Sequence, residues 1–152
     1  MSKTPFVVRV YGVYIHPVSG VLVSDEFVFG QRVTKFPGGG LEFGEGTREC
    51  LKREMIEETG QEFNVLEHLY TTDFFVPSAF DQSIQVVSIY YRMEPVGPLE
   101  FTISSLPFDF QLNQSQSFRF IPSASLGPES FSLVIDRHVG ELLNIRAKVL
   151  HQ

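Results

Sequence analysis

Short apolar runs separated by turn-forming residues dominate the first third of the chain. Residues 6–15, FVVRVYGVYI, are nearly all apolar or aromatic and rich in valine, which predicts a strand buried on both faces. The segment HPVSG at 16–20 predicts a turn, because proline, serine and glycine favour tight bends. Two short strands are then expected at 21–23 and 27–29, followed by a glycine-rich loop over 38–46.

The middle of the chain predicts a pair of longer strands. Residues 63–76 and 83–94 are expected to pair antiparallel, because the connection between them is short. Prolines interrupt residues 95–116, so this stretch is predicted to be a long irregular loop of the kind that often covers a binding site. A last strand is expected at 117–121.

A helix is predicted in two places. Residues 47–59 lie between Gly46 and Gly60, and glycine just after a helix commonly closes it. Near the C-terminus, Asp136 is expected to cap a helix that runs to about residue 149. The apolar stripe of this second helix would be Val139, Leu142, Leu143 and Leu150. This order of strands and helices, without regular alternation, favours an α+β fold with helices packed on a mixed sheet.

The first predicted helix combines apolar and acidic positions. At about 100° per residue, Leu51, Met55 and Ile56 share a side that is expected to be buried. Three carboxylates fall within an arc of about 100° on another side, namely Glu54, Glu57 and Glu58. Two like charges ~4 Å apart repel by ~1 kcal/mol in bulk water and by ~4 kcal/mol at an effective dielectric of about 20. The arrangement therefore favours a bound divalent cation that prefers oxygen ligands.

Composition and charge narrow the classes of partner. The 152 residues, 43% hydrophobic and 20% charged, are expected to form one globular domain over 1–152. A net charge of −6 with no basic cluster argues against a nucleic-acid partner. The single cysteine, Cys50, excludes an intrachain disulfide and is expected to be packed. No segment has the roughly 18 apolar residues of a membrane span, and the N-terminus does not have the pattern of a signal peptide. We therefore expect a soluble, cytoplasmic protein with no membrane partner.

From Gly39 onward the sequence resembles the signature of the Nudix (MutT-like) hydrolase family, G-x5-E-x7-R-E-U-x-E-E-x-G-U, in which U is a bulky aliphatic residue. The residues that match the fixed positions at the required spacing are Gly39, Glu45, Arg53, Glu54, Glu57, Glu58 and Gly60. Met55 fills the first U position, whereas the last one is occupied by Gln61. We expect this one departure to alter local packing more than chemistry.

The resemblance implies a fold and an activity. The fold would be an α/β/α sandwich around a mixed β-sheet. The activity would be hydrolysis, with Mg²⁺ or Mn²⁺, of a small-molecule nucleoside diphosphate linked to another moiety. The resemblance leaves the substrate open among nucleotide sugars, ADP-ribose, dinucleotides and nucleoside triphosphates. It also leaves open a homodimer, because Nudix domains often pair.

The resemblance also assigns roles to residues of this sequence. Metal binding would fall to Glu54, Glu57 and Glu58, and catalysis to Glu54, Arg53 and Glu57, with Glu54 the candidate general base. Arg53 would orient the carboxylates by charge-assisted hydrogen bonds, and Glu45 would join loop to helix through it. The substrate loop would be shaped by Gly38, Gly39 and Gly40. The position of any further catalytic acid or ligand stays open: Glu100 and Asp109 are the only acids of the long loop, and neither has a motif around it.

Two other interpretations stay open. The chain could be a non-catalytic nucleotide sensor or interaction module on a Nudix scaffold. The lack of a recognisable further acid favours this view, and the intact set of glutamates argues against it. The chain could also carry a merely solvated acidic helix, in which case Glu54→Gln and Glu57→Gln would leave metal affinity unchanged.

Overall fold

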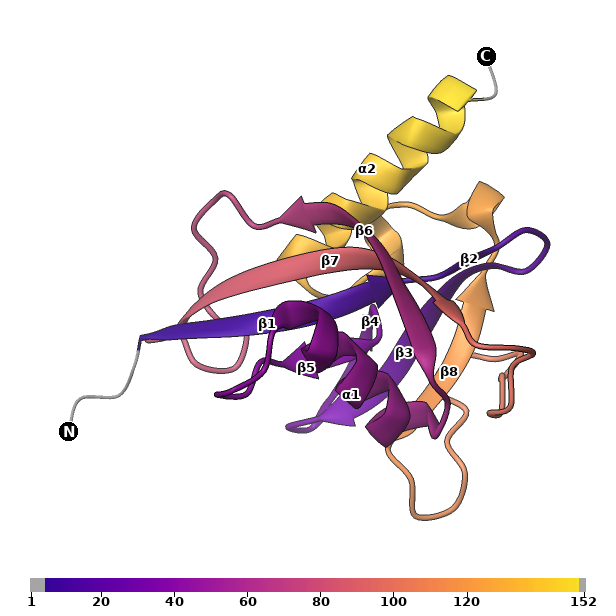
Figure 1. Cartoon of the computed structure of the whole chain (residues 1–152), viewed down its shortest axis with the longest axis horizontal. Helices are drawn as coiled ribbons and strands as arrows, with labels where there is room; N and C mark the ends of the chain where they lie inside the picture. The colour runs from indigo at the N-terminus through magenta and orange to yellow at the C-terminus, as the bar shows by residue number, and fades with distance from the viewer. Residues whose placement is uncertain (1–4, 151–152) are drawn as a thin grey trace. The chain divides into compact units, whose positions relative to one another are not determined.

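The computed structural model describes residues 5–150, with side chains omitted for residues 145 and 147–150 (Figure 1). The chain forms two compact units, each made of two separate stretches. The first unit is described over residues 5–14 and 37–101, and the second over 15–36 and 102–150. Among the described residues, no helix combines the length and the apolar character that a membrane span requires.

The first unit contains a four-stranded mixed sheet and one helix. The strand order is β5-β1-β7-β6. Strands β1 and β7 run parallel, while β5 pairs with β1 and β6 with β7 in antiparallel fashion. The elements are β1 (Phe6–Val13), β5 (Gly38–Gly40), α1 (Thr47–Thr59), β6 (Phe63–Thr71) and β7 (Gln85–Pro95).

The second unit is built on an antiparallel sheet in which β3 pairs with three strands. Its elements are β2 (Ile15–His16), β3 (Gly20–Val28), β4 (Gln31–Lys35), β8 (Gln116–Ile121), the short 3-10 helices η1 (Ser123–Ser125) and η2 (Pro128–Ser130), and α2 (Val134–Leu150). Phe36 and Phe131 stack in its core with ring centroids 4.3 Å apart, although 95 positions of sequence separate them. This unit contains the long loop between β7 and β8 from Thr102 onward.

The predicted fold class is confirmed: the described residues form a mixed sheet and two α-helices, without regular βαβ alternation. The antiparallel pairing of β6 with β7, the last strand and the bounds of α1 are also as expected. The first strand ends at Val13, earlier than predicted, and only its second half is fully buried. Phe6, at its start, is exposed because it lies at the end of the sheet, so burial on both faces was wrong for this half.

The prediction of two short strands at 21–23 and 27–29 was wrong, because one strand, β3, runs through both. The polar residues between them look like a turn in the sequence, but Asp25 is fully buried. Its carboxylate accepts hydrogen bonds from Thr34 Oγ1 (2.7 Å) and Arg119 Nε (2.6 Å). A buried carboxylate that is paired in this way can stay inside a strand. Strand β4, which supplies Thr34, was not predicted.

Two further predictions need correction. The start of the glycine-rich loop is strand β5, paired with β1, although glycine disfavours strands. Helix α2 begins at Val134, so Asp136 lies in its first turn and is not the capping residue. Val139 of the predicted stripe is buried, Leu142 and Leu143 are half-buried, and the side chain of Leu150 lies outside the described residues.

The departure from the Nudix signature at Gln61 has a clear structural role. Gln61 is buried, and its Nε2 donates to the carbonyl oxygens of Val96 (3.2 Å) and Pro98 (3.0 Å). Its Oε1 accepts from the backbone N–H of Glu100 (2.9 Å). Three hydrogen bonds from one side chain therefore fasten the segment after β7 to the end of α1. The expectation of an effect on packing agrees with these contacts.

Gln61→Leu, although it restores the bulky aliphatic residue of the signature, is expected to lower the free energy of unfolding by about 1–3 kcal/mol. The reason is that the Val96 and Pro98 carbonyl oxygens and the Glu100 N–H would each lose a hydrogen bond to Gln61. Urea unfolding of the variant beside wild type measures this. Glu62→Leu, at the exposed neighbouring position, is the matched control and should stay within about 0.5 kcal/mol of wild type. A Gln61→Leu protein as stable as wild type would contradict the assigned role.

Candidate functional site

Helix α1 is fixed at both ends by glycine. Gly46 precedes it in an extended conformation, and its N–H donates to the Glu49 side chain at 3.3 Å. Gly60 follows with a φ of 74°, and its N–H donates to the Ile56 carbonyl at 2.8 Å. A positive φ of this size is the conformation that glycine adopts without steric cost, so the helix ends at Thr59 as the sequence predicted.

The buried side of α1 differs from the predicted one. Cys50, Leu51 and Met55 are fully buried, but Ile56 is 51% exposed. At about 100° per residue, Ile56 lies about 140° around the helix from Leu51, whereas Glu54 lies between Cys50 and Leu51. Accordingly, the Glu54 side chain is only 15% exposed. The predicted separation of a buried face from an acidic face was therefore wrong, because the two overlap at Glu54.

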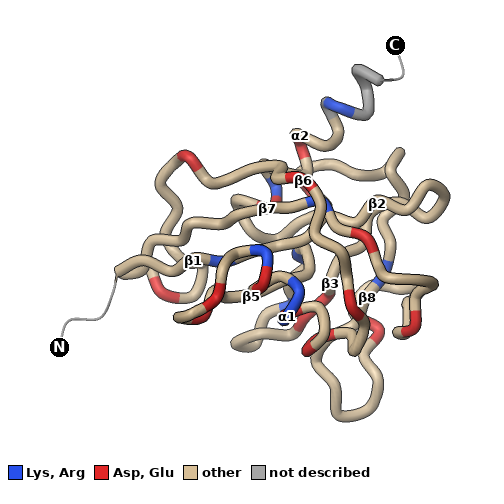
Figure 2. The backbone as a smooth tube through the Cα atoms, viewed as in Figure 1, with Lys and Arg blue, Asp and Glu red and all other residues tan. Residues whose placement is uncertain are grey.

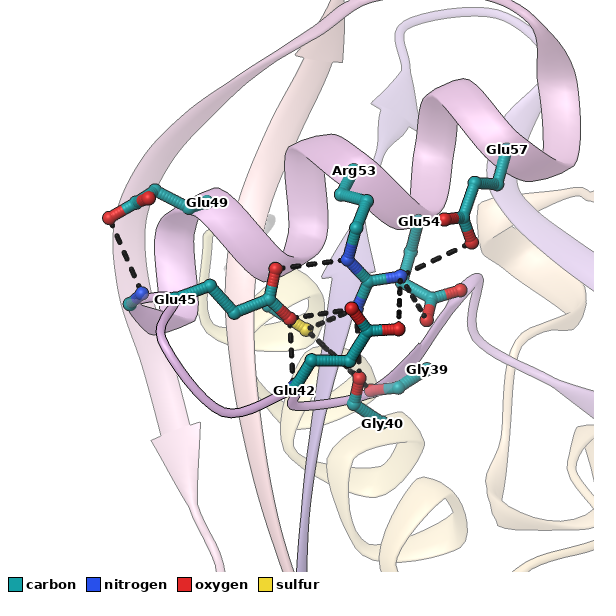
Figure 3. A network of polar contacts seen from close by, with 10 residues as sticks. Gly39, Gly40, Glu42, Glu45, Glu49, Arg53, Glu54 and Glu57 are labelled. Atoms are coloured by element: carbon teal, nitrogen blue, oxygen red, sulfur yellow. Dashed lines mark hydrogen bonds and ion pairs between the residues drawn. The ribbon is translucent and has the colours of Figure 1, made fainter.

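The glycines of β5 make room for this overlap. A Cβ placed on Gly39 would lie 2.5 Å from both Cδ and Oε1 of Glu54, so the carboxylate occupies the space that a side chain would fill (Figure 3). Gly38 has a φ of 142°, and a Cβ there would overlap the carbonyl oxygen of Val10. A residue with a side chain would therefore be strained at position 38, and at position 39 it would displace the Glu54 carboxylate.

Arg53 holds the acidic residues together. Its guanidinium makes a bidentate contact with Glu45, with Nε to Oε2 at 2.9 Å and Nη2 to Oε1 at 2.7 Å (Figure 3). Nη1 donates to Glu54 Oε1 at 3.1 Å and to Glu57 Oε2 at 3.2 Å, and Nη2 donates to the Gly40 carbonyl at 3.0 Å. Each of the five N–H donors of an arginine side chain can therefore be matched to an oxygen. The network ties the loop, β5 and α1 into one site.

The hydrogen bonds and charges of this network shift the pKa values of Glu45, Arg53 and Cys50. The hydrogen bond from Arg53, then the backbone bond from Glu42, lowers the pKa of Glu45 from 4.5 to about 2. The same contact with Glu45 raises the pKa of Arg53. Burial, followed by the hydrogen bond with Glu45, raises the pKa of the Cys50 thiol to about 12. Glu45 and Arg53 are therefore fully ionised at neutral pH, and Cys50 is a packed thiol, as expected.

The lowered pKa of Glu45 predicts a pH-dependent contribution to stability. A carboxyl whose folded pKa lies below its unfolded pKa stabilises the fold above the unfolded value, here 4.5, and loses this contribution as the pH falls toward about 2. Glu45→Gln should therefore be less stable than wild type at about pH 6, and the difference should shrink at about pH 3. Urea unfolding at the two pH values measures it. A difference that stays constant would show that the ionised Arg53–Glu45 pair does not cause it.

The structure brings most of the predicted site residues together. Glu45, Arg53, Glu54 and Glu57 share one network with the β5 glycines, and acidic and basic positions lie side by side along α1 (Figure 2). The Glu57 side chain is 57% exposed, while Glu58 has one buried carboxylate oxygen. In the described part of the chain, no three aspartate, glutamate, histidine or cysteine side chains form a ready-made metal site. Arg53 Nη1 instead lies between Glu54 and Glu57.

One acidic member of this network, Glu42, was not predicted. Glu42 Oε1 lies 3.7 Å from Arg53 Nη1, and the backbone N–H of Glu42 donates to Glu45 Oε1 at 2.9 Å. The signature leaves this position unspecified, so no fixed spacing pointed to it. The only signal was its place three residues before Glu45, within the turn that leads to the helix. Glu100, a candidate further acid, is exposed and is held through its backbone by Gln61.

Comparison with known proteins agrees with this architecture. The sequence profile of the NUDIX domain matches residues 7–119. Among solved structures, the MutT protein from Methanosarcina mazei Go1 is similar with a TM-score of 0.68 at 15% identity, over 97% of this chain and 99% of that one. A UDP-X diphosphatase is similar with a TM-score of 0.63 at 20% identity, over 100% of this chain and 66% of that one. An ADP-ribose pyrophosphatase from Streptococcus suis 89-1591 gives a TM-score of 0.57 at 16% identity, over 95% and 92% of the two chains.

Identities this low establish a common fold and no more. The profile match, in contrast, covers well over half of the chain and includes the whole segment from Gly39 to Gly60. The chain therefore belongs to the Nudix hydrolase family.

Proposed function

We propose that this protein is a pyrophosphohydrolase, dependent on Mg²⁺ or Mn²⁺, that cleaves a nucleoside diphosphate linked to another moiety. The observation that carries the proposal is the Glu54 carboxylate, held by Arg53 against the backbone of Gly39. A carboxylate in this place can accept a proton from a water molecule that attacks a phosphate lying along the glycine strand. We also propose that residues 1–152 act as a single Nudix domain, since the profile match takes residues from both units.

The donor atoms of the site suit a hard divalent cation. Glu54, Glu57 and Glu58 offer carboxylate oxygens only, which Mg²⁺ and Mn²⁺ prefer over nitrogen or sulfur. Mg²⁺ usually binds proteins through one or two carboxylates, with water and substrate phosphate completing its shell, so a closed cage of three side chains is not required. A bound divalent cation would supply neutralisation of phosphate charge and a lower pKa for water in the site.

The remaining roles fall to residues of the chain itself. Glu54 would take the proton from water, and Arg53 would keep Glu54 and Glu57 oriented. Glu45 would fix Arg53 to the loop, and the β5 glycines would let a phosphate approach the backbone closely. The roles of Arg53 and Glu45 use the contacts described above.

Product analysis on a panel of nucleotide derivatives tests the proposal. The panel should contain UDP-glucose, ADP-ribose, a dinucleoside polyphosphate and nucleoside triphosphates, because they represent the open substrate types and the activities named for similar structures. Each is incubated with Mg²⁺ or Mn²⁺ and either wild type or Glu57→Gln. Cleavage of the pyrophosphate by wild type, strongly reduced in the variant and absent with EDTA, is the expected result. No metal-dependent turnover of any compound would overturn the proposal.

One observation favours a second candidate, a nucleotide sensor on the same scaffold. Arg53 Nη1 already bridges Glu54 and Glu57, so a guanidinium of the chain itself offsets the charge of two of the three carboxylates that would hold a metal. A sensor would bind a nucleotide of the panel tightly without cleaving it, and Glu57→Gln would bind it as wild type does. The same panel, read by calorimetry, separates the two functions.

A further inference from the structure

A second charged group lies at the glycine strand, across from Glu54. Arg9 of β1 is the register partner of Gly40 in β5. Arg9 Nη1 lies 3.8 Å from the position that a Cβ of Gly40 would take, just as the Glu54 carboxylate lies against Gly39. Successive residues of a strand face opposite sides of a sheet. The edge strand therefore has a carboxylate on one side and a guanidinium on the other.

Buried aromatic residues hold the Arg9 side chain in this place. Arg9 Nε donates to the Tyr11 hydroxyl at 2.6 Å, and Arg9 Cζ lies 5.6 Å from the centre of the Tyr11 ring. Tyr11 packs against Tyr90 with centroids 5.3 Å apart, and Tyr90 is 6.3 Å from Tyr70. Tyr11 and Tyr90 are buried, whereas Arg9 is only half-buried. A rigid ring stack thus positions a guanidinium that still reaches the surface, which reduces the entropy lost when it binds a ligand.

The three other arginines described in this unit contact groups other than the Cβ position of Gly40. Arg53 is bound by glutamates, and Arg92 forms an ion pair with Glu67. Arg48 donates to the carbonyl oxygens of Val65 and Leu66 at 3.1 and 2.7 Å, where the pairing of β6 with β7 is irregular. These contacts are structural. Arg9 is the arginine that the register of β1 places opposite Gly40.

A diphosphate that approaches Glu54 and Glu57 meets an unfavourable field, because the site and the chain as a whole are acidic. A guanidinium offsets this field and can bind two phosphate oxygens at once. We propose that Arg9 binds a phosphate of the nucleoside diphosphate at the glycine strand and thereby sets the affinity for substrate. The inference rests on the proposed function, since it assigns a phosphate contact to the same site.

The test measures KM, kcat and nucleotide affinity for Arg9→Gln. Losing one charge-assisted contact should raise KM for the best substrate of the panel, and weaken ADP binding measured by calorimetry, by about 10- to 100-fold. The kcat should stay within about threefold, because the role assigned to Arg9 is to bind phosphate and not to take the proton from water. Arg9→Lys should keep part of the affinity that Arg9→Gln loses, since lysine retains the positive charge but cannot bind two phosphate oxygens at once as a guanidinium does.

Two further variants separate substrate binding from structural damage. Arg92→Gln removes a positive charge from the same sheet and should leave KM and ADP affinity unchanged. Tyr11→Phe keeps the ring stack but removes the hydroxyl that positions Arg9, so KM should rise by a smaller factor than in Arg9→Gln. The unfolding midpoint of each variant is measured beside wild type, to confirm that changes in affinity do not follow changes in stability.

The outcomes distinguish this inference from the proposed function. If Arg9→Gln cleaves substrate with unchanged KM, Arg9 does not bind phosphate, although the hydrolase stands. If kcat falls and KM does not, the inference is likewise overturned. If wild type cleaves nothing but Arg9→Gln loses affinity for ADP, the hydrolase is lost and the phosphate contact stands. If wild type binds neither ADP nor inorganic pyrophosphate, with or without Mg²⁺, both are wrong.

Discussion

Glu54→Gln is expected to lower kcat by about 10³-fold while the protein stays folded, because general bases typically contribute 10²- to 10⁴-fold. Glutamine keeps the shape that fits over Gly39 and can still accept a hydrogen bond from Arg53 through its carbonyl oxygen. It cannot take a proton from water, and it is a weaker ligand for a divalent cation. The fall should therefore appear in kcat, with thermal unfolding close to that of wild type.

Glu49→Gln is the matched control for this substitution. Glu49 lies on the same helix and contributes one acceptor, to the Gly46 N–H, which glutamine also provides. It removes the same charge from α1 without touching the Arg53 network. Activity of Glu49→Gln should match wild type, and steady-state kinetics of the three proteins with the best substrate of the panel decide the question. A Glu54→Gln enzyme within about tenfold of wild type would remove Glu54 from the role of base.

Gly39→Ala should lower kcat by about 10²- to 10³-fold at little cost in stability, an effect comparable to removing one preorganised catalytic contact. The added methyl group would lie 2.5 Å from Glu54, so the carboxylate must move. It lies at the far end of a flexible side chain, which makes the movement cheap in folding free energy. Gly39 has an ordinary backbone conformation, so alanine adds no strain of its own.

A double-mutant cycle isolates this mechanism. If Gly39→Ala acts by displacing the Glu54 carboxylate, it should add little to the loss already caused by Glu54→Gln, because both changes remove the same group. Fully multiplicative losses would indicate that Gly39 acts on the substrate directly, and equal activity of Gly39→Ala and wild type would mean that Glu54 can work from another position. Unfolding curves for all four proteins accompany the kinetics.

Sequence alone predicted the parts of this molecule that depend on local spacing. The bounds of α1 follow from two flanking glycines, and the meeting of Glu45 with Arg53 follows from the Nudix signature. The overlap of buried and acidic positions at Glu54 was missed, since it depends on the space left by a glycine strand that comes from elsewhere in the sheet. The angular positions of residues around a helix do not show which other element packs against that helix.

The remaining errors have the same origin in distant contacts. Strand β3 was predicted as two strands because Asp25 looks like a turn residue in the sequence. Its burial depends on Arg119, which lies 94 residues further along the chain. Gln61 looked like a tolerated irregularity until its three bonds to the segment after β7 could be seen. Arg9 carried no signal at all, because an arginine within an apolar strand is uninformative until the register places it beside Gly40.

The position of Arg53 between Glu54 and Glu57 also bears on whether this protein needs the proposed divalent cation in order to fold. Repulsion between the carboxylates is already offset by a guanidinium built into the chain, so folding does not have to wait for an ion. Proteins whose ligand sets are stabilised by metal alone fold only when the ion is supplied, and chelators unfold them. Here a chelator should remove activity and leave the unfolding temperature almost unchanged. A cell depleted of Mg²⁺ or Mn²⁺ would thus retain a folded, dormant enzyme that resumes turnover as soon as the ion returns.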